Sequence, residues 1–327
     1  KFWKEIEKDN FDNELIELID CYLNSKSYKF SSKFWNILNI GHLNQIKNFG
    51  IENFVTSIAM SYFTFISYDD KKISDLIRYV ENKNINLNYF SNQIYKKQIN
   101  IDITHSINHN ILLNLLYAYI KHNNYDQFLP ILEKNNFLIN KVPNLKIDNF
   151  TITQDKLNSI IEYVSIKKIL DKFNTPTQNI LEIGAGSGRT TETLISLLEN
   201  DKKIKYVIVD IPPALYINYL RMRNNYKNKK IQLCFDIKNE GELDKIFNEN
   251  DIILILPHHL ELFKKKIFNI TIAIDCLHEM DRKTIKFYME QINIVSKNFY
   301  FKVWDETHLP YSFNHYLKAK EKKSYFI

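Results

Sequence analysis

The fold of this chain is decided by the stretch Asn179-Ile-Leu-Glu-Ile-Gly-Ala-Gly-Ser-Gly-Arg-Thr190. Its first part, 180–183, is a short apolar run typical of a buried parallel strand. Three of the chain's 6 glycines follow at alternate positions, Gly184, Gly186 and Gly188. Leucines at helical spacing come directly after this turn. A strand that ends in a glycine turn and opens a helix presents backbone N–H groups to a ligand.

The spacing of these glycines separates two kinds of cofactor site. Dinucleotide-binding folds favour G-x-G-x-x-G, whereas this turn reads G-x-G-x-G with Glu182 ahead of it. That variant resembles the first motif of class I S-adenosylmethionine-dependent methyltransferases, in which the loop surrounds the amino-acid end of the cofactor. The residues that this resemblance assigns to the methionine part of the cofactor are Glu182, Gly184, Ala185, Gly186 and Gly188. A purely structural turn is the competing interpretation, because glycine-rich turns are common in α/β proteins.

A second apolar run, 205–209, ends at Asp210. An acidic side chain at such a strand end can accept hydrogen bonds from both ribose hydroxyls of an adenosine. We place Asp210 and the following Ile211 in the cofactor site. Asp210 can also cap the helix that follows Pro212-Pro213, and the two roles are compatible. The glycine turn and the strand-end acid together predict a nucleoside-type cofactor.

Two later runs compete for the contact with adenine. The candidates are Asp236, after the run 231–235, and Leu256, Pro257 and His258, at the end of the run 252–256. We prefer the second group, because its strand comes directly before the strand that ends at Asp275. Asp236 then becomes a loop acid or a helix cap.

The run 270–274 leads into Asp275-Cys-Leu-His-Glu-Met280, which supplies the candidate catalytic residues Asp275, His278 and Glu279. Ligands bind outside the carboxyl ends of the strands in an open parallel sheet. Methyl transfer to an alcohol needs a positioned acceptor and the loss of its proton, and histidine titrates in the right range to take that proton. Glu279 or Asp275 would orient the imidazole or bind substrate hydroxyls.

Other interpretations of this cluster stay open. His278 can be a polar loop residue, and Glu279 can contribute to the dipole of the next helix. The Asp, His and Glu side chains can also hold Mg²⁺, but we prefer a site without metal ligands. Lys302, near the last predicted strand, would pair with a phosphate of the substrate or remain a plain surface lysine.

The spacing of apolar residues divides the chain into a helical part and a part in which strands and helices alternate. Residues 1–150 show apolar spacings of three and four residues, which predict helices. The clearest helical segments are 15–23, 73–80 and 107–119. From Ile180 on, short apolar runs alternate with helical segments, which predicts a parallel sheet with helices on both faces. We therefore predict an α-helical N-terminal domain over 1–150 and an α/β, Rossmann-like domain with a mostly parallel sheet over 151–327.

Composition narrows the class of protein. The chain has 327 residues, of which 45% are hydrophobic, so it can bury a sizeable core. Its formal net charge of +6 permits an anionic substrate without requiring nucleic acid. We expect a cytoplasmic protein, because the 3 cysteines are scattered and no apolar run is long enough to span a membrane. The chain begins at Lys1 rather than Met, which favours a fragment of a longer protein, and its oligomeric state, a homodimer included, is open.

Several motifs in order resemble the bacterial sugar O-methyltransferases found among genes for surface and capsular polysaccharide. The matching segments are 181–190, 210–216, 256–259 with Glu261, 277–280 and 301–304. The resemblance implies a class I methyltransferase domain, S-adenosylmethionine as donor with S-adenosylhomocysteine as product, and a sugar or nucleotide-sugar acceptor such as a heptose or hexose. Asp275-Cys276 departs from the family, where small polar residues precede Leu-His-Glu.

Three competing functions remain. The first is a methyltransferase that acts on another capsule precursor, of phosphoramidate or lipid-linked type. The second is a non-catalytic scaffold that binds the cofactor. The third is an NAD-binding oxidoreductase, which the glycine spacing disfavours.

Overall fold

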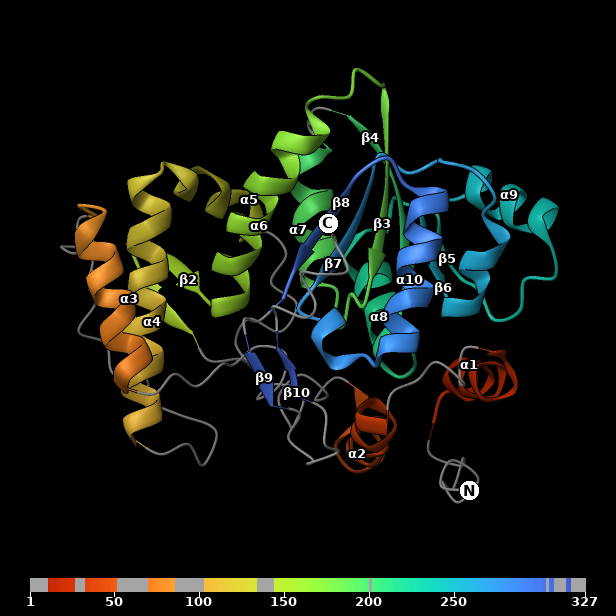
Figure 1. Cartoon of the computed structure of the whole chain (residues 1–327), viewed down its shortest axis with the longest axis horizontal. Helices are drawn as coiled ribbons and strands as arrows, with labels where there is room; N and C mark the ends of the chain where they lie inside the picture. Colours follow the sequence, from red (N-terminus) through yellow and green to blue (C-terminus); the bar gives the residue numbers. More distant parts are fainter. Residues whose placement is uncertain are drawn as a thin grey trace.

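The computed structural model describes residues 11–26, 33–51, 70–85, 103–133, 144–199, 202–303, 306–308 and 316–318. Within these ranges a parallel sheet with helices on both faces stands beside further helices from the N-terminal part (Figure 1). The α/β class and the Rossmann-like sheet expected from the sequence are confirmed.

The sheet has six strands in the order β5-β6-β4-β3-β7-β8, and every neighbouring pair is parallel. The strands are β3 (Thr177–Ile183), β4 (Lys203–Val209), β5 (Ile231–Leu233), β6 (Ile252–Ile255), β7 (Ile270–Ile274) and β8 (Phe299–Lys302). From β3 the chain adds β4 on one side and β5 at the edge, and β6 then fills the place between β4 and β5. The chain next crosses to the other side of β3, where it adds β7 and β8. The strand order therefore reverses between β3 and β7, where ligands bind in open α/β sheets.

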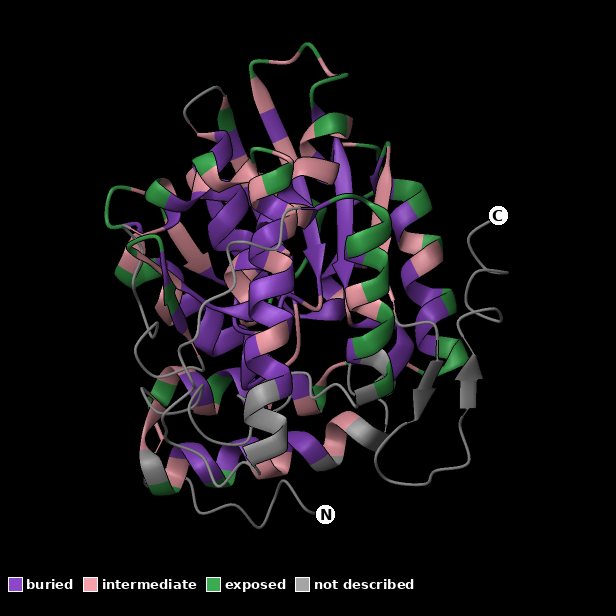
Figure 2. Ribbon diagram, turned by 90° about the vertical axis from the view of Figure 1, so that its left-hand side faces the viewer, coloured by how far each residue is buried: buried purple, intermediate pink, exposed green. Residues whose placement is uncertain are grey.

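Both faces of the sheet are covered, because its central strands are apolar at successive positions. The central strands are coloured as buried in Figure 2. Their side chains alternate between two buried clusters: Ile180 and Ile208 face one, whereas Leu181 and Val207 face the other. The first cluster is covered by α6 (Gln154–Leu170), α7 (Arg189–Leu198) and α8 (Ala214–Asn225), and the second by α9 (Glu240–Glu249) and α10 (Arg282–Val295). Burial on two faces explains why these strands show continuous rather than alternating hydrophobicity.

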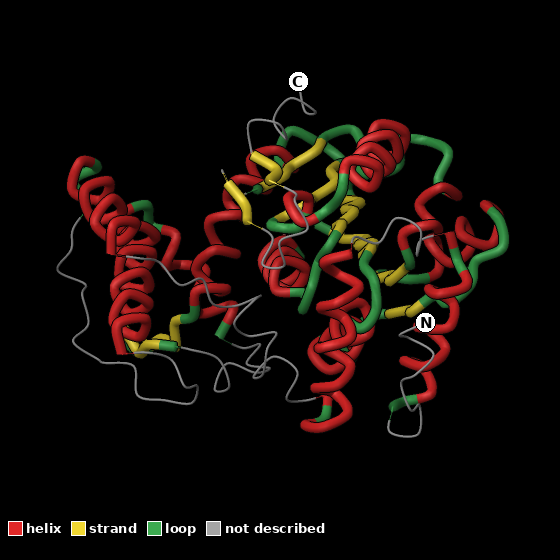
Figure 3. Tube along the Cα trace, turned by 60° about the horizontal axis from the view of Figure 1, so that its bottom comes forward, coloured by secondary structure: helices red, strands yellow, loops and turns green. Residues whose placement is uncertain are grey.

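The N-terminal helices form two groups. The elements are α1 (Asn13–Asn24), α2 (Lys33–Phe49), α3 (Asp70–Asn82), α4 (Ile103–His122), η6 (Tyr125–Phe128) and α5 (Leu129–Leu132). The helices α3 and α4 pack together beside α6, whereas α1 and α2 lie at the carboxyl edge of the sheet (Figure 1). Figure 3, in which that edge comes forward, keeps the two groups apart. The helices predicted at 15–23, 73–80 and 107–119 are confirmed.

Within the described residues, four short strands lie outside the main sheet. They are β1 (Leu145–Ile147), β2 (Phe150–Ile152), β9 (Glu306–His308) and β10 (Tyr316–Lys318). β1 and β2 pair as an antiparallel hairpin, as do β9 and β10. The first hairpin occupies the connection around residue 150. One buried cluster runs through it, from α1 and α4 across to α6 and β3. A boundary at 150 stays a prediction, but the two parts share a core.

Candidate functional site

The glycine turn has the backbone that its sequence predicts. Gly184, Gly186 and Gly188 have φ of 68°, 56° and 84°, in the region that favours glycine. Packing also excludes larger side chains at two of them. A Cβ on Gly184 would lie 2.6 Å from the Cβ of Cys276, and one on Gly188 would lie 2.6 Å from Oδ1 of Asn218. Part of the motif is therefore explained by the close approach of other elements.

Asp210 contacts this turn directly. Its Oδ2 accepts a hydrogen bond from the Gly186 amide at 2.7 Å, and its Oδ1 accepts one from the Ile211 amide at 2.7 Å. Burial raises the pKa of Asp210 to about 7. Each carboxylate oxygen has a second lone pair for another donor. The structure thus brings together the two features, the glycine turn and the strand-end acid, from which a nucleoside cofactor is predicted.

Glu182 lies in the interior beneath the turn. Its Oε2 accepts hydrogen bonds from the Tyr206 hydroxyl at 2.6 Å and the Thr191 hydroxyl at 2.7 Å, and burial raises its pKa. The carboxyl group therefore links β3 to β4 and α7. Its contact with the methionine part of the cofactor stays a prediction. Ala185, the remaining turn residue of that prediction, is buried.

The end of β6 lies beside Asp210, as preferred from the sequence. β6 pairs directly with β4, the strand that ends at Asp210, whereas β5 is one strand further out. Leu256 and Pro257 are buried and His258 is half-buried at the start of η8 (Pro257–Leu262). Asp236, after β5, is exposed and pairs with Lys238. The topology therefore favours Leu256, Pro257 and His258 for the adenine contact, which stays a prediction.

Asp275 follows β7 in a left-handed conformation with φ of 54°, which aspartate tolerates better than most residues. Its Oδ2 lies 3.2 Å from Nζ of Lys302 and 3.5 Å from Nη2 of Arg189. Its Oδ1 is buried and has no hydrogen-bond partner among the described residues. A buried acceptor at this strand end is suited to a donor from a ligand.

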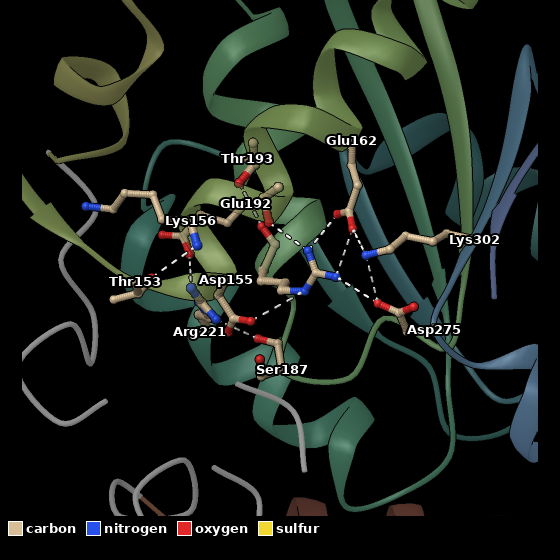
Figure 4. Close-up of polar contacts among 12 residues, drawn as sticks. Thr153, Asp155, Lys156, Glu162, Ser187, Glu192, Thr193, Arg221, Asp275 and Lys302 are labelled. Carbon is tan, nitrogen blue, oxygen red and sulfur yellow. Dashed lines mark hydrogen bonds and ion pairs between the residues drawn. The ribbon is translucent and has the colours of Figure 1, made fainter. Parts of the chain in front are cut away.

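Asp275 belongs to an ion cluster that joins the residue after β7 to α6, α7 and β8 (Figure 4). Arg189 donates two hydrogen bonds to Glu162, at 2.6 and 3.2 Å, and Lys302 donates one at 2.9 Å. Burial opposes the charge of Glu162, but Arg189 and Lys302 outweigh it and hold its pKa below the usual value. Arg189 also lies 3.7 Å from Asp155, whose pKa burial raises to about 6.

Lys302 therefore forms ion pairs with Glu162 and Asp275. Neither Arg189 nor Glu162 is among the site residues predicted from the sequence. Arg189 directly follows Gly188 in the deciding stretch, which was the available signal, whereas Glu162 is simply one of many polar positions on a predicted helix.

His278 and Glu279 also follow β7, in the short 3-10 helix η9 (Leu277–Glu279). Both side chains are buried, with 1% and 6% exposure, and Nε2 of His278 lies 3.5 Å from Oε1 of Glu279. Oε2 of Glu279 accepts a hydrogen bond from Nε1 of Trp35 at 3.0 Å. Burial raises the pKa of Glu279 well above the usual value of a glutamate, although the hydrogen bond from Trp35 opposes that shift.

Within the described ranges, no three His, Cys, Asp or Glu side chains are grouped so as to hold a metal ion. The helices in the same ranges include none with the length and apolar character needed to cross a membrane.

No family model and no curated protein matches the chain. Several solved structures are similar at low identity. The CMeT domain of the citrinin polyketide synthase is 14% identical, with a TM-score of 0.32, and the match covers 89% of this chain and 80% of that one. The CurJ carbon methyltransferase is 13% identical, with a TM-score of 0.32, and the match covers 90% of this chain and 77% of that one. The pyocyanin biosynthetic protein PhzM is 12% identical, with a TM-score of 0.29, and the match covers 84% of this chain and 76% of that one. Similarities this low carry no argument, and the α/β fold rests on the strand order itself.

Proposed function

We propose that this chain is an S-adenosylmethionine-dependent O-methyltransferase that acts on a sugar hydroxyl, such as that of a nucleotide-linked heptose or hexose. The hydrogen bond from the Gly186 amide to Asp210 carries the proposal. This hydrogen bond joins the glycine turn to the strand-end acid. Both lie at the edge of the sheet where β7 ends and His278 follows it. The sugar itself rests on the sequence resemblance.

The side chains at this edge fit the donor. Asp210 has lone pairs left for ribose hydroxyls, and the end of β6 offers Leu256, Pro257 and His258 for adenine. The unpartnered Oδ1 of Asp275 suits the ammonium group of the methionine part. When bound, the cofactor supplies an electrophilic methyl group on a sulfonium.

The chain's own residues then have to position the acceptor and take its proton. His278 would accept the proton that the sugar hydroxyl loses as its oxygen is methylated. Glu279, whose Oε1 lies 3.5 Å from Nε2 of the imidazole, would hold the ring in place.

The proposal is tested by incubating the protein with methyl-labelled S-adenosylmethionine and a panel of nucleotide-sugars, with and without chelator. We expect label in the sugar, and loss of at least about 100-fold in kcat for His278→Ala. His122→Ala, at an exposed position at the end of α4, is the matched control and should transfer like the wild-type protein.

Two results would redirect the assignment. Cofactor binding without transfer to any sugar would move the acceptor to another capsule precursor, tested with phosphoramidate and lipid-linked substrates. Turnover by His278→Ala at the wild-type rate would remove His278 as the base.

A further inference from the structure

The side chain of Trp35 on the N-terminal helix α2 reaches the predicted transfer site. The Trp35 indole donates its N–H to Glu279, which lies 244 positions further along the chain. Its ring centroid also lies 6.2 Å from that of His42, which is buried on the same helix. The contact therefore joins a packed position of α2 to the turn that follows β7.

The two oxygens of Glu279 face different partners. Oε2 accepts the hydrogen bond from Trp35 at 3.0 Å, and Oε1 lies 3.5 Å from Nε2 of His278. A carboxyl group with one oxygen held by a donor is restricted in rotation about its last bond. The position of the oxygen that faces the imidazole therefore depends on Trp35.

We propose that Trp35 is a positioning residue for the transfer reaction, which makes α2 part of the active site. The inference rests on the function proposed above. Trp35 holds the carboxyl group of Glu279 in one orientation, and that group holds the imidazole of His278 toward the acceptor. Small displacements of a reacting group reduce the rate by as much as about 100-fold. The contact acts through Glu279, so it affects the chemical step more than the binding of cofactor.

The test is Trp35→Phe, which keeps an aromatic side chain and removes the N–H donor. We expect kcat to fall about tenfold or more, while KM for the sugar and Kd for S-adenosylhomocysteine stay within about twofold. Asn44→Ala, at an exposed position of the same helix, is the matched control and should leave all three constants unchanged.

A second measurement covers the case in which Trp35→Phe disturbs the fold. The protein labelled with ¹⁵N-tryptophan has one indole N–H signal for each of its 3 tryptophans. The Trp35 signal should move in Glu279→Leu and stay in place in Asn44→Ala. An unmoved signal in Glu279→Leu would refute the contact and with it the inference.

The kinetic outcomes separate the inference from the proposed function. An active wild-type protein with an equally active Trp35→Phe variant would overturn the inference alone. A rise in KM at unchanged kcat would also overturn it, because Trp35 would then bind substrate. Wild-type protein that transfers to no acceptor would overturn the proposed function, and the inference would fall with it.

Discussion

At the scale of single residues, burial raises the pKa of two acids at the predicted site, Asp210 and Glu279. Asp210 accepts two backbone hydrogen bonds, which favour its charged form, yet burial outweighs them and raises its pKa to about 7. Burial also raises the pKa of Glu279 well above its usual value, against the hydrogen bond from Trp35. The pKa values of both acids are therefore determined by their surroundings rather than by their residue type.

If Asp210 holds the ribose as proposed, its pKa should make cofactor affinity depend on pH. Ribose hydroxyls would donate to the carboxylate, so binding would favour the deprotonated form. As the pH falls through about 7, Asp210 takes up a proton and Kd for S-adenosylhomocysteine should rise, by at most about tenfold per pH unit. Calorimetric titrations between pH 5.5 and pH 8.5, roughly the range that brackets this pKa, measure the effect.

Asp210→Asn should bind weakly at every pH of that series. Asp236→Asn, at the rejected strand end, is the control and should behave like the wild-type protein. Equal weakening by Asp236→Asn would place the adenine at the end of β5 instead.

At the scale of elements, the ion cluster ties the helix before the sheet to the helix after the glycine turn. Glu162 on α6 has a side chain only 3% exposed and is held by Arg189 at the start of α7 and Lys302 of β8. Because two cations surround one buried anion, these ion pairs stabilise the packing of α6 and α7 against the end of β8. The cluster also places Asp275 next to the turn through its contacts with Arg189 and Lys302.

Arg189→Met should lower the free energy of unfolding by about 3–5 kcal/mol, because it removes the main partner of a buried charge. The double variant Arg189→Met/Glu162→Met should be more stable than the single one, since the buried charge of Glu162 is then removed together with its main partner. Denaturant titrations at pH 7 measure both. Lys286→Ala, which breaks a largely exposed pair with Glu290 at 3.8 Å, should change the value by less than about 0.5 kcal/mol. A double variant no more stable than Arg189→Met would show that the charge of Glu162 is not what the cluster satisfies.

At the scale of the whole molecule, the helical part and the sheet share one buried cluster. Leu113 and Tyr117 of α4 belong to the same cluster as Ile160 of α6 and Ile180 of β3. The rings of Phe128 and Tyr163 pack edge to face across this junction, with centroids 5.1 Å apart. Removing the N-terminal part would expose the outer face of α6.

We therefore expect the full chain to unfold in a single calorimetric transition and the fragment 144–327 to melt at a lower temperature. The fragment should also bind a hydrophobic dye through the exposed face of α6. A fragment with the Tm of the full chain would instead support two independent folding units divided near residue 150.

What the sequence by itself determined is the part of the protein built from local patterns. The glycine turn, the apolar strands and the spaced helices 15–23, 73–80 and 107–119 depend on residues near one another in the chain, so their periodicity predicts them. The preference for the end of β6 over Asp236 also came from order along the chain, and strand pairing agrees with it.

Only the tertiary structure decided which distant side chains meet. Trp35 and Glu279 have no pattern that links them, and the contact arises because α2 lies at the edge where the parallel strands end. The hydrogen bonds that Glu182 accepts from Tyr206 and Thr191, and the one that Glu162 accepts from Lys302, likewise depend on packing between elements. Such contacts are set by the burial of whole faces, which no single stretch of sequence contains.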